Sequence, residues 1–289
     1  MSAPVAVVGL GKMGTAIAGR LLDAGFPLAV GNRTQGREQP LTERGASWLP
    51  DFGAALAEGD VCVTSLSDDR AVLAAAGPIL AKARSGTLLV ETSTISLDAS
   101  RRVAEQAAER GVDYVRAPIS GNPVAVGSGT AAVFASGPAG ALDRAAPVLQ
   151  AISPKVRQVG AGDGARVLKL VLGVLIGGTA ELLAEALVLG ESAGLGRSAL
   201  LEAIGDSAVG STFVAYKTKP LVDEDYSATF TTSMMLKDIR LVLDLATETH
   251  VELPFAGRLQ SLLESACDSG HAEKDFMSLL LQLEERRAS

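Results

Sequence analysis

The sequence contains few of the side chains that bind metal ions or form disulfides. Among its 289 residues there are two cysteines and two histidines. Cys62 and Cys267 are too far apart to suggest a disulfide framework, and neither His250 nor His271 has acidic or cysteine neighbours at the spacing of metal ligands. We therefore expect two reduced thiols and no metal site.

Signals for export, membrane insertion and nucleic-acid binding are also weak. The N-terminus runs directly into a strand pattern without a basic region or a cleavage site, so no secretory signal is expected. The most apolar stretch, residues 167–189, contains Lys169, Glu181 and Glu185, so we interpret it as a buried helix rather than a membrane span. A net charge of −7 argues against nucleic acid as the main partner. The composition predicts a cytoplasmic globular protein with no membrane or nucleic-acid partner.

The first half of the sequence alternates strand-like and helix-like segments. We expect strands at residues 5–8, 28–30, 61–66, 88–90, 114–115 and 131–134, and helices at residues 13–24, 69–84, 97–110 and 139–151. Such alternation is typical of βαβ units around a mainly parallel sheet. After Gly164 the strand signals nearly stop, and helices are expected at residues 167–193, 198–204, 235–249 and 259–267.

The predicted fold class is therefore an α/β Rossmann-type N-terminal domain, residues 1–162, followed by an all-α C-terminal domain, residues 163–289. The switch point of such a sheet and the crevice between two such domains are where a small-molecule site is expected.

The first expected strand runs into a glycine-rich turn and then a helix. The turn has the pattern G-x-G-x-x-G and consists of Gly9, Leu10, Gly11, Lys12, Met13 and Gly14. Gly9 permits a tight turn, Gly11 lets the backbone approach a pyrophosphate, and Gly14 lets the helix pack closely on the strand. The phosphates would face the positive end of the helix dipole. The context on both sides favours a dinucleotide-binding site over a turn that binds nothing.

The residues after the second strand indicate which dinucleotide is bound. NAD-binding domains usually place Asp or Glu there, to bond the ribose 2′-hydroxyl. This chain has Asn32, Arg33 and Thr34 instead. No carboxylate repels a 2′-phosphate, and the guanidinium of Arg33 can bind one. The sequence therefore predicts NADPH (NADP+) as the cofactor, although Arg33 as a plain surface charge is the simpler alternative.

Five segments, taken in order and at their spacing, resemble the β-hydroxyacid dehydrogenase family, which includes 3-hydroxyisobutyrate dehydrogenase and glyoxylate/succinic semialdehyde reductases. They are GLGKMGTAIAGRLLDAG (9–25), VCVTSLSDDRAV (61–72), ETSTISLDAS (91–100), RAPISGNPVAVGSGTAAVFASGP (116–138) and GDGARVLKLVLGVLIGGTAELLAEAL (162–187). A sixth, MLKDI (235–239), resembles the family's C-terminal K-D motif. The resemblance covers nearly the whole chain and implies a fold like that of 6-phosphogluconate dehydrogenase.

The resemblance implies further cofactor contacts. Ser65 and Leu66 stand at the turn that passes under the cofactor, and Thr94 takes a cofactor-contact position near the nicotinamide. Lys237 matches the lysine that reaches the nicotinamide end. Glu91 stands where many members have aspartate.

The resemblance also implies the substrate-binding residues. Ser120 and Gly121 would offer a hydroxyl and a backbone N–H to a substrate carboxylate. Asn122 and the proline after it replace the second glycine usual there, which predicts a reshaped pocket floor. Gly173 replaces the asparagine that the family carries one helical turn after its essential lysine, and the vacated space predicts a bulkier or less polar substrate.

Lys169 falls at the position of that essential lysine. Considered alone, a lysine in an apolar helical run can simply extend its ammonium group to solvent. If it is held in a cleft, desolvation lowers its pKa toward the working pH, and it can exchange a proton with a carbonyl oxygen as hydride is transferred. We therefore expect a dehydrogenase or reductase with Lys169 as general acid and base.

Three expectations remain open at this point. Imine reductases share the architecture and the Asn-Arg-Thr sequence found here at residues 32–34, but they usually carry Asp or Tyr in place of the lysine, so imine reduction is the nearest alternative. A catalytically silent dinucleotide-binding module is a second. The family also implies a homodimer formed through the helix that carries Gly173, Gly177 and Gly178, although these glycines can equally serve packing within one chain.

Overall fold

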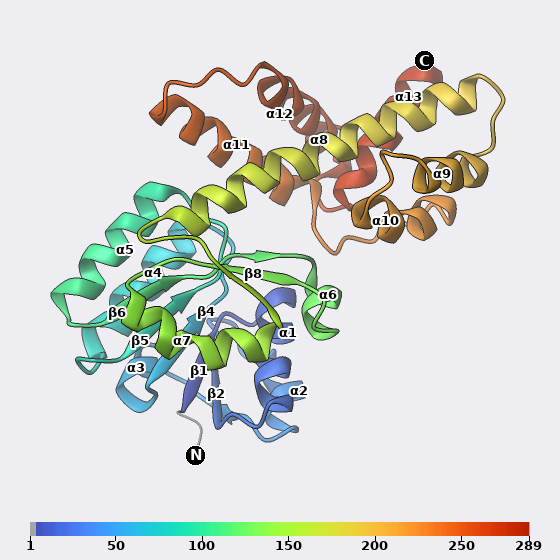
Figure 1. The fold of residues 1–289 in the computed structure, drawn as a ribbon. Coiled ribbons are helices and arrows are strands. Elements are labelled where there is room, and N and C mark those ends of the chain that lie inside the picture. The colour runs from blue at the N-terminus through green and yellow to red at the C-terminus, as the bar shows by residue number, and fades with distance from the viewer. Residues whose placement is uncertain (1–3, 289) are drawn as a thin grey trace. The chain divides into compact units, whose positions relative to one another are not determined.

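The computed structural model describes residues 4–288. Contacts between residues divide the chain into a first unit that ends at Lys169 and a second that begins at Leu170. The long helix α8 (Gly164–Ser192) starts in the first unit and continues into the second (Figure 1).

The first unit is built on a six-stranded parallel sheet with the order β3-β2-β1-β4-β5-β6. Its strands are β1 (Val5–Val8), β2 (Leu28–Gly31), β3 (Ser47–Trp48), β4 (Val61–Thr64), β5 (Leu88–Glu91) and β6 (Asp113–Arg116). Its helices are α1 (Lys12–Asp23), α2 (Gln39–Thr42), α3 (Ala55–Glu58), α4 (Asp69–Lys82), α5 (Leu97–Glu109), α6 (Pro123–Gly127) and α7 (Ala139–Ile152). The strand order reverses between β1 and β4, which is the switch point where such sheets bind ligands.

Helices cover both faces of this sheet because its central strands are apolar on both sides. In β1, Val5 and Val7 pack in one buried cluster with Ile17 of α1 and residues of α7. Ala6 points to the opposite face and packs with Ile79 of α4 and residues of α5. The predicted Rossmann-type fold of this part of the chain is confirmed.

A second, three-stranded sheet follows, with the order β7-β8-β9. Its strands are β7 (Ile119–Ser120), β8 (Ala132–Ala135) and β9 (Lys155–Gln158). β8 pairs antiparallel with β7 and parallel with β9. Only β8 was expected, because β7 has two residues and β9 is mostly polar, so neither gives an apolar strand pattern.

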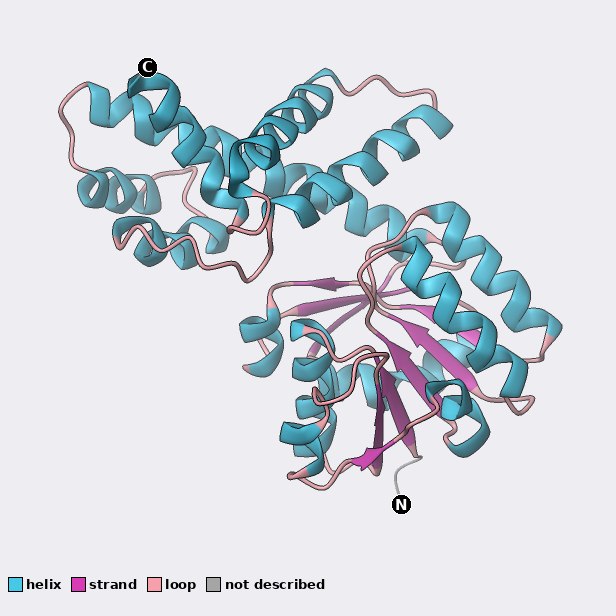
Figure 2. Cartoon of the chain, turned by 180° about the vertical axis from the view of Figure 1, so that it is seen from behind, coloured by secondary structure: helices cyan, strands magenta, loops and turns pink. Residues whose placement is uncertain are grey.

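Within residues 170–288, the regular structure that is described is helical, and Figure 2 shows strands only in the first unit. After α8 come α9 (Arg197–Asp206), α10 (Thr212–Val222), α11 (Thr232–Glu248), α12 (Pro254–Ala266) and α13 (Leu279–Ala288). Their core brings together Leu187 of α8, Ile239 of α11 and Leu263 of α12. The all-α expectation is confirmed, although α10 and α13 were not predicted.

The expectation that residues 167–189 form a buried helix is wrong in one respect. Among the described residues, α8 is the one helix long and apolar enough to cross a membrane. An 18-residue stretch of it has a mean hydropathy of 1.9, and 39% of that stretch is buried. Leu175, Leu182 and Leu189 are 61%, 58% and 74% exposed. Intervals of seven residues place them along one side of the helix. Because α8 has apolar residues on every face, its pattern does not reveal which face the chain itself covers.

Candidate cofactor and active site

The glycine turn between β1 and α1 has the backbone geometry that its glycines allow. Gly9 adopts a φ of +97°, and a Cβ at this position would lie 2.3 Å from the carbonyl oxygen of Ser65. A Cβ at Gly14 would lie 1.8 Å from the carbonyl oxygen of Gly9. No larger side chain fits at either position without moving the backbone.

Gly11 differs from these two glycines because the space beside it is open. It is the N-cap of α1, no side chain caps this end, and no atom lies within 4 Å of where its Cβ would be. Lys12 and Met13 then begin the helix. The first amides of a helix lack intrahelical acceptors and carry the positive end of the dipole. The cradle that a Cβ at Gly11 would fill therefore suits a pyrophosphate.

Asn32 connects this turn to the end of β2. Its Oδ1 accepts a hydrogen bond from the amide of Leu10 at 3.0 Å, and its Nδ2 donates to the carbonyl of Thr34 at 2.8 Å. Arg33 and Thr34 are exposed. Asn32 thus holds the turn in which Arg33 is presented, and no carboxylate occurs between Gly31 and Arg37.

The loops after β4 and β5 meet beside the glycine turn between β1 and α1. The amide of Ser65 donates to the carbonyl of Val8 at 3.0 Å, and the amide of Leu66 donates to Oγ of Ser93 at 2.8 Å. Thr94, the next residue, is half-buried. The structure therefore brings these loops together at the carboxyl edge of the parallel sheet, where dinucleotide sites form.

Lys169 lies in the second turn of α8, and its side chain reaches the segment that carries Ser120. Its Nζ donates a hydrogen bond to the carbonyl of Ile119 at 2.8 Å. Ile119 and Ser120 form β7, so the ammonium group sits at the backbone next to the predicted carboxylate-binding pair. Lys169 is half-buried.

The turn after β7 explains why asparagine and proline replace a glycine there. Gly121 has a φ of +138°, and its Cβ would lie 3.0 Å from the Cβ of Ala131. Oδ1 of Asn122 accepts a hydrogen bond from the amide of Ala125 at 2.8 Å, which caps α6. Pro123 then occupies the first helical position, where its missing N–H costs nothing.

Two predicted site residues belong to the second unit. Gly173 follows Lys169 by one turn of α8, and a Cβ there would contact only Val242, at 4.0 Å. Nζ of Lys237, on α11, lies 2.7 Å from a carboxylate oxygen of Asp238. Gly173 thus leaves room on the helix face that carries Lys169.

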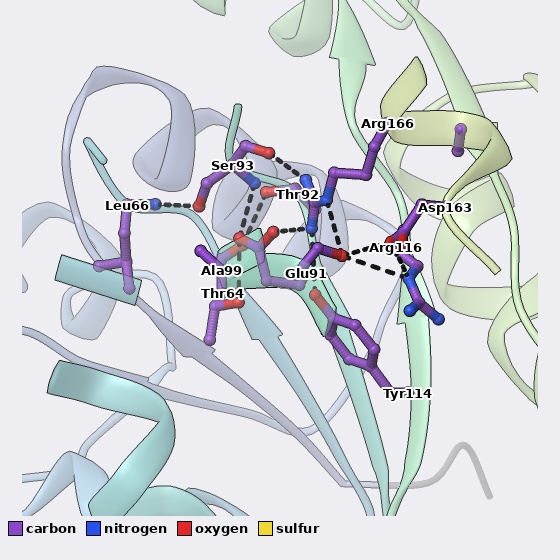
Figure 3. Close-up of polar contacts among 12 residues, drawn as sticks. Thr64, Leu66, Glu91, Thr92, Ser93, Ala99, Tyr114, Arg116, Asp163 and Arg166 are labelled. Atoms are coloured by element: carbon purple, nitrogen blue, oxygen red, sulfur yellow. Dashed lines mark hydrogen bonds and ion pairs between the residues drawn. The ribbon is translucent and has the colours of Figure 1, made fainter. Parts of the chain in front are cut away.

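Sequence reasoning missed a buried ionic network at the start of α8 (Figure 3). Arg166 forms an ion pair with Glu91, and each side chain is 1% exposed. Arg166 also donates to the carbonyl of Ser93 and, at 3.2 Å, to the hydroxyl of Tyr114. Burial raises the pKa of Tyr114. Burial disfavours the charge of Arg166, yet the pKa of this guanidinium is raised because Glu91 and Tyr114 stabilise it. The one signal in the sequence was an arginine three residues before Lys169 in an apolar run.

Two family models together match nearly the whole chain. A model described as the NAD binding domain of 6-phosphogluconate dehydrogenase matches residues 4–160. A model described as NAD-binding of NADP-dependent 3-hydroxyisobutyrate dehydrogenase matches residues 160–283. Both descriptions name a nicotinamide dinucleotide, and the turn around Gly11 has the cradle that such a cofactor needs.

Known proteins of this kind are similar over their full length. An NAD-dependent L-serine dehydrogenase from Pseudomonas aeruginosa is 31% identical, with 94% of this chain and 95% of that protein covered. A structure of 3-hydroxyisobutyrate dehydrogenase from Mycobacterium tuberculosis with L-serine is 27% identical, covers 98% of this chain and 99% of that one, and has a TM-score of 0.88. A reductive aminase from Aspergillus terreus in complex with NADPH and ethyl-5-oxohexanoate is 26% identical, covers 98% of this chain and 100% of that one, and has a TM-score of 0.62.

Proposed function

Because the chain belongs to the β-hydroxyacid dehydrogenase family, we propose that it is an NADPH-dependent oxidoreductase acting on a small carbonyl or β-hydroxyacid substrate, with Lys169 as general acid and base. The observation that supports this most is the hydrogen bond from Nζ of Lys169 to the carbonyl of Ile119, directly before Ser120 and Gly121. It holds a proton donor beside the pair that we assign to the substrate carboxylate.

The bound nicotinamide supplies or accepts the hydride at the substrate carbon. In reduction, Lys169 donates a proton to the carbonyl oxygen as that oxygen gains charge, and in oxidation it accepts the hydroxyl proton. The hydroxyl of Ser120 and the amide of Gly121 bind the substrate carboxylate, which fixes the distance from the reacting carbon to Lys169. Lys237 remains a predicted contact of the nicotinamide end.

The preference for NADPH over NADH is supported by the turn after β2. Arg33 is exposed there and can bind a 2′-phosphate, and the neighbouring positions lack the carboxylate that NAD-binding domains use. Asn32 holds this turn against the glycine turn through Leu10, so the 2′-phosphate and pyrophosphate positions are coupled.

The reaction class is tested with three kinds of substrate by following the consumption or the formation of NADPH. We expect turnover with short oxoacids or semialdehydes such as glyoxylate and succinic semialdehyde, and NADP+ reduction with β-hydroxyacids such as L-serine. Cyclic imines, with the same cofactor, are the comparison. Turnover of cyclic imines alone would assign the chain to imine reduction, the alternative that open space at Gly173 favours, and tight NADPH binding without turnover of any substrate would indicate a binding module.

We further propose that the exposed side of α8 forms a homodimer interface. Leu175, Leu182 and Leu189 recur every seven residues along one exposed side of α8, and exposed apolar residues grouped in this way often mark interfaces. Replacing Leu182 by arginine is expected to convert the dimer to monomer, because a charge then lies in an apolar contact. Light scattering after size-exclusion chromatography measures the mass, and Val209→Arg is the control because Val209 is an apolar residue outside α8 that is even more exposed than Leu182, 72% against 58%. A wild-type protein that elutes as a monomer contradicts the interface.

A further inference from the structure

The start of α8 is fastened to the parallel sheet by two charges of opposite sign, the fully buried Arg166 and the partly buried Asp163. Arg166 pairs with Glu91 at the end of β5. Asp163, three residues earlier, accepts a hydrogen bond from Nε of Arg116, at the end of β6, at 2.9 Å. Figure 3 shows both pairs lying side by side at the carboxyl ends of these strands. Two contacts one turn apart determine both the position of α8 and its rotation about its own axis.

Ser100 of α5 joins the two pairs. Its Oγ lies 2.7 Å from a carboxylate oxygen of Asp163, to which it donates. The same Oγ lies 3.3 Å from Nε of Arg116 and 3.4 Å from Nε of Arg166. Ser100 is fully buried. The result is a chain of alternating charge that runs from Arg116 to Glu91 and is largely buried, with Asp163 as its most exposed member.

The other end of the chain reaches the loops assigned to the cofactor. Oε1 of Glu91 accepts a hydrogen bond from the amide of Ser93 at 2.8 Å, and Arg166 binds the carbonyl of the same residue. Oγ of Ser93 in turn accepts from the amide of Leu66 at 2.8 Å. Ser93 is therefore held at three points, two of which belong to the ion pair, and Thr94 follows it directly.

Stability alone is a weak reason for such an arrangement. Removing two charges from water has a large desolvation cost, and replacing a buried pair by apolar residues of similar volume is often neutral or stabilising. Because Arg166 binds both Glu91 and the carbonyl of Ser93, it provides what a charge-assisted hydrogen bond can provide, a fixed distance between two elements. Here those elements are the loop after β5 and the helix that carries Lys169 one turn beyond Arg166.

We propose that Arg166 and Glu91 are positioning residues that hold Nζ of Lys169 at the carbonyl of Ile119 and tie it to the cofactor loop at Ser93. This inference rests on the proposed function, in which Lys169 transfers the proton. A displacement of about 1 Å at a reacting group can lower the rate about 100-fold. The pair therefore acts on the reaction through Lys169 and not by touching the substrate.

Three variants separate positioning from stability. Arg166→Met leaves the carboxylate of Glu91 buried and unpaired, so it is expected to lower both the melting temperature and kcat, the latter about tenfold or more. The double variant Arg166→Met/Glu91→Met removes both charges and is expected to recover part of the melting temperature but not kcat or its pH profile. Arg144→Met is the control, because Arg144 forms an exposed ion pair with Asp113 in the same unit. In Arg166→Met and in the double variant, KM for NADPH is expected to change less than kcat.

A second measurement follows the lysine itself, independently of turnover. Trace acetylation with acetic anhydride across a pH series, read by peptide mass spectrometry, reports the reactivity of Lys169, with the exposed Lys155 as the internal reference. We expect the labelling of Lys169 relative to Lys155 to change at least threefold in Arg166→Met and in the double variant. Unchanged labelling, or a double variant that recovers kcat and its pH profile together with stability, overturns the inference. Full turnover by Lys169→Ala would overturn the proposed function instead, and the labelling ratios would still decide whether the pair positions Lys169.

Discussion

Replacing Lys169 by alanine is expected to lower kcat by about 10²–10⁴-fold while NADPH binding is retained, because general acid–base catalysis typically contributes that much. The side chain is half-buried and donates to the carbonyl of Ile119, which Ser120 follows. Its removal therefore takes away the proton donor beside the predicted substrate carboxylate site without touching the glycine turn or Arg33. Steady-state kinetics gives kcat, and fluorescence titration gives the affinity for NADPH.

Two further lysine variants make this test specific. Lys169→Arg keeps the positive charge but cannot release its proton at working pH, so it is expected to remain as slow as the alanine variant. Lys155→Ala is the matched control, because Nζ of Lys155 also lies near a backbone carbonyl, that of Thr130 at 3.4 Å. Small primary amines added to Lys169→Ala are expected to restore part of the rate. A near-normal kcat for Lys169→Ala would refute the assignment.

Replacing Arg33 by alanine is expected to raise KM for NADPH by about 10–100-fold and to leave KM for NADH nearly unchanged. A hydrogen bond to a charged group contributes about 1.5–3 kcal/mol, and each 1.4 kcal/mol corresponds to a factor of about ten. The difference between the two cofactors is the 2′-phosphate, so only NADPH loses a partner. Arg33 is exposed, and Asn32 keeps the shape of the turn through Leu10 and Thr34.

The comparison with NADH makes the result independent of folding. A variant with a disturbed turn would lose affinity for both cofactors, whereas the loss of a phosphate contact affects one. Arg110→Ala, at the exposed end of α5, is the control for the change in net charge. Equal effects of Arg33→Ala on both cofactors would contradict the NADPH preference.

The parts of the fold that the sequence predicts are those in which neighbouring residues carry the signal. β1, the glycine turn and α1 form one continuous stretch, and each glycine there has a local reason, such as the positive φ of Gly9. The alternation of apolar strands and helices was sufficient to predict a parallel sheet, and the near absence of strand signals after Gly164 was sufficient to predict a helical second part. By contrast, β7 and β9 have no apolar pattern of their own and exist because β8 lies between them.

The site divides in the same way. The sequence alone was sufficient to single out the glycine turn, Arg33 and Lys169 as candidate site residues and to predict a nicotinamide cofactor. The contact of Lys169 with Ile119 joins residues 50 positions apart, and the pair of Arg166 with Glu91 joins residues 75 apart. Neither leaves a local pattern, because a buried charge has the same appearance in a sequence as an exposed one until its partner is known.

The sequence by itself thus determined the class of fold, the position of the dinucleotide turn and the lysine in the apolar helix, since periodicity and glycine spacing are properties of neighbouring residues. Only the tertiary structure decided where that lysine points, which side of α8 remains exposed, and that Asn122 caps a helix. These depend on which distant segments come together when the core is buried, and the partners of a polar group are chosen at that step.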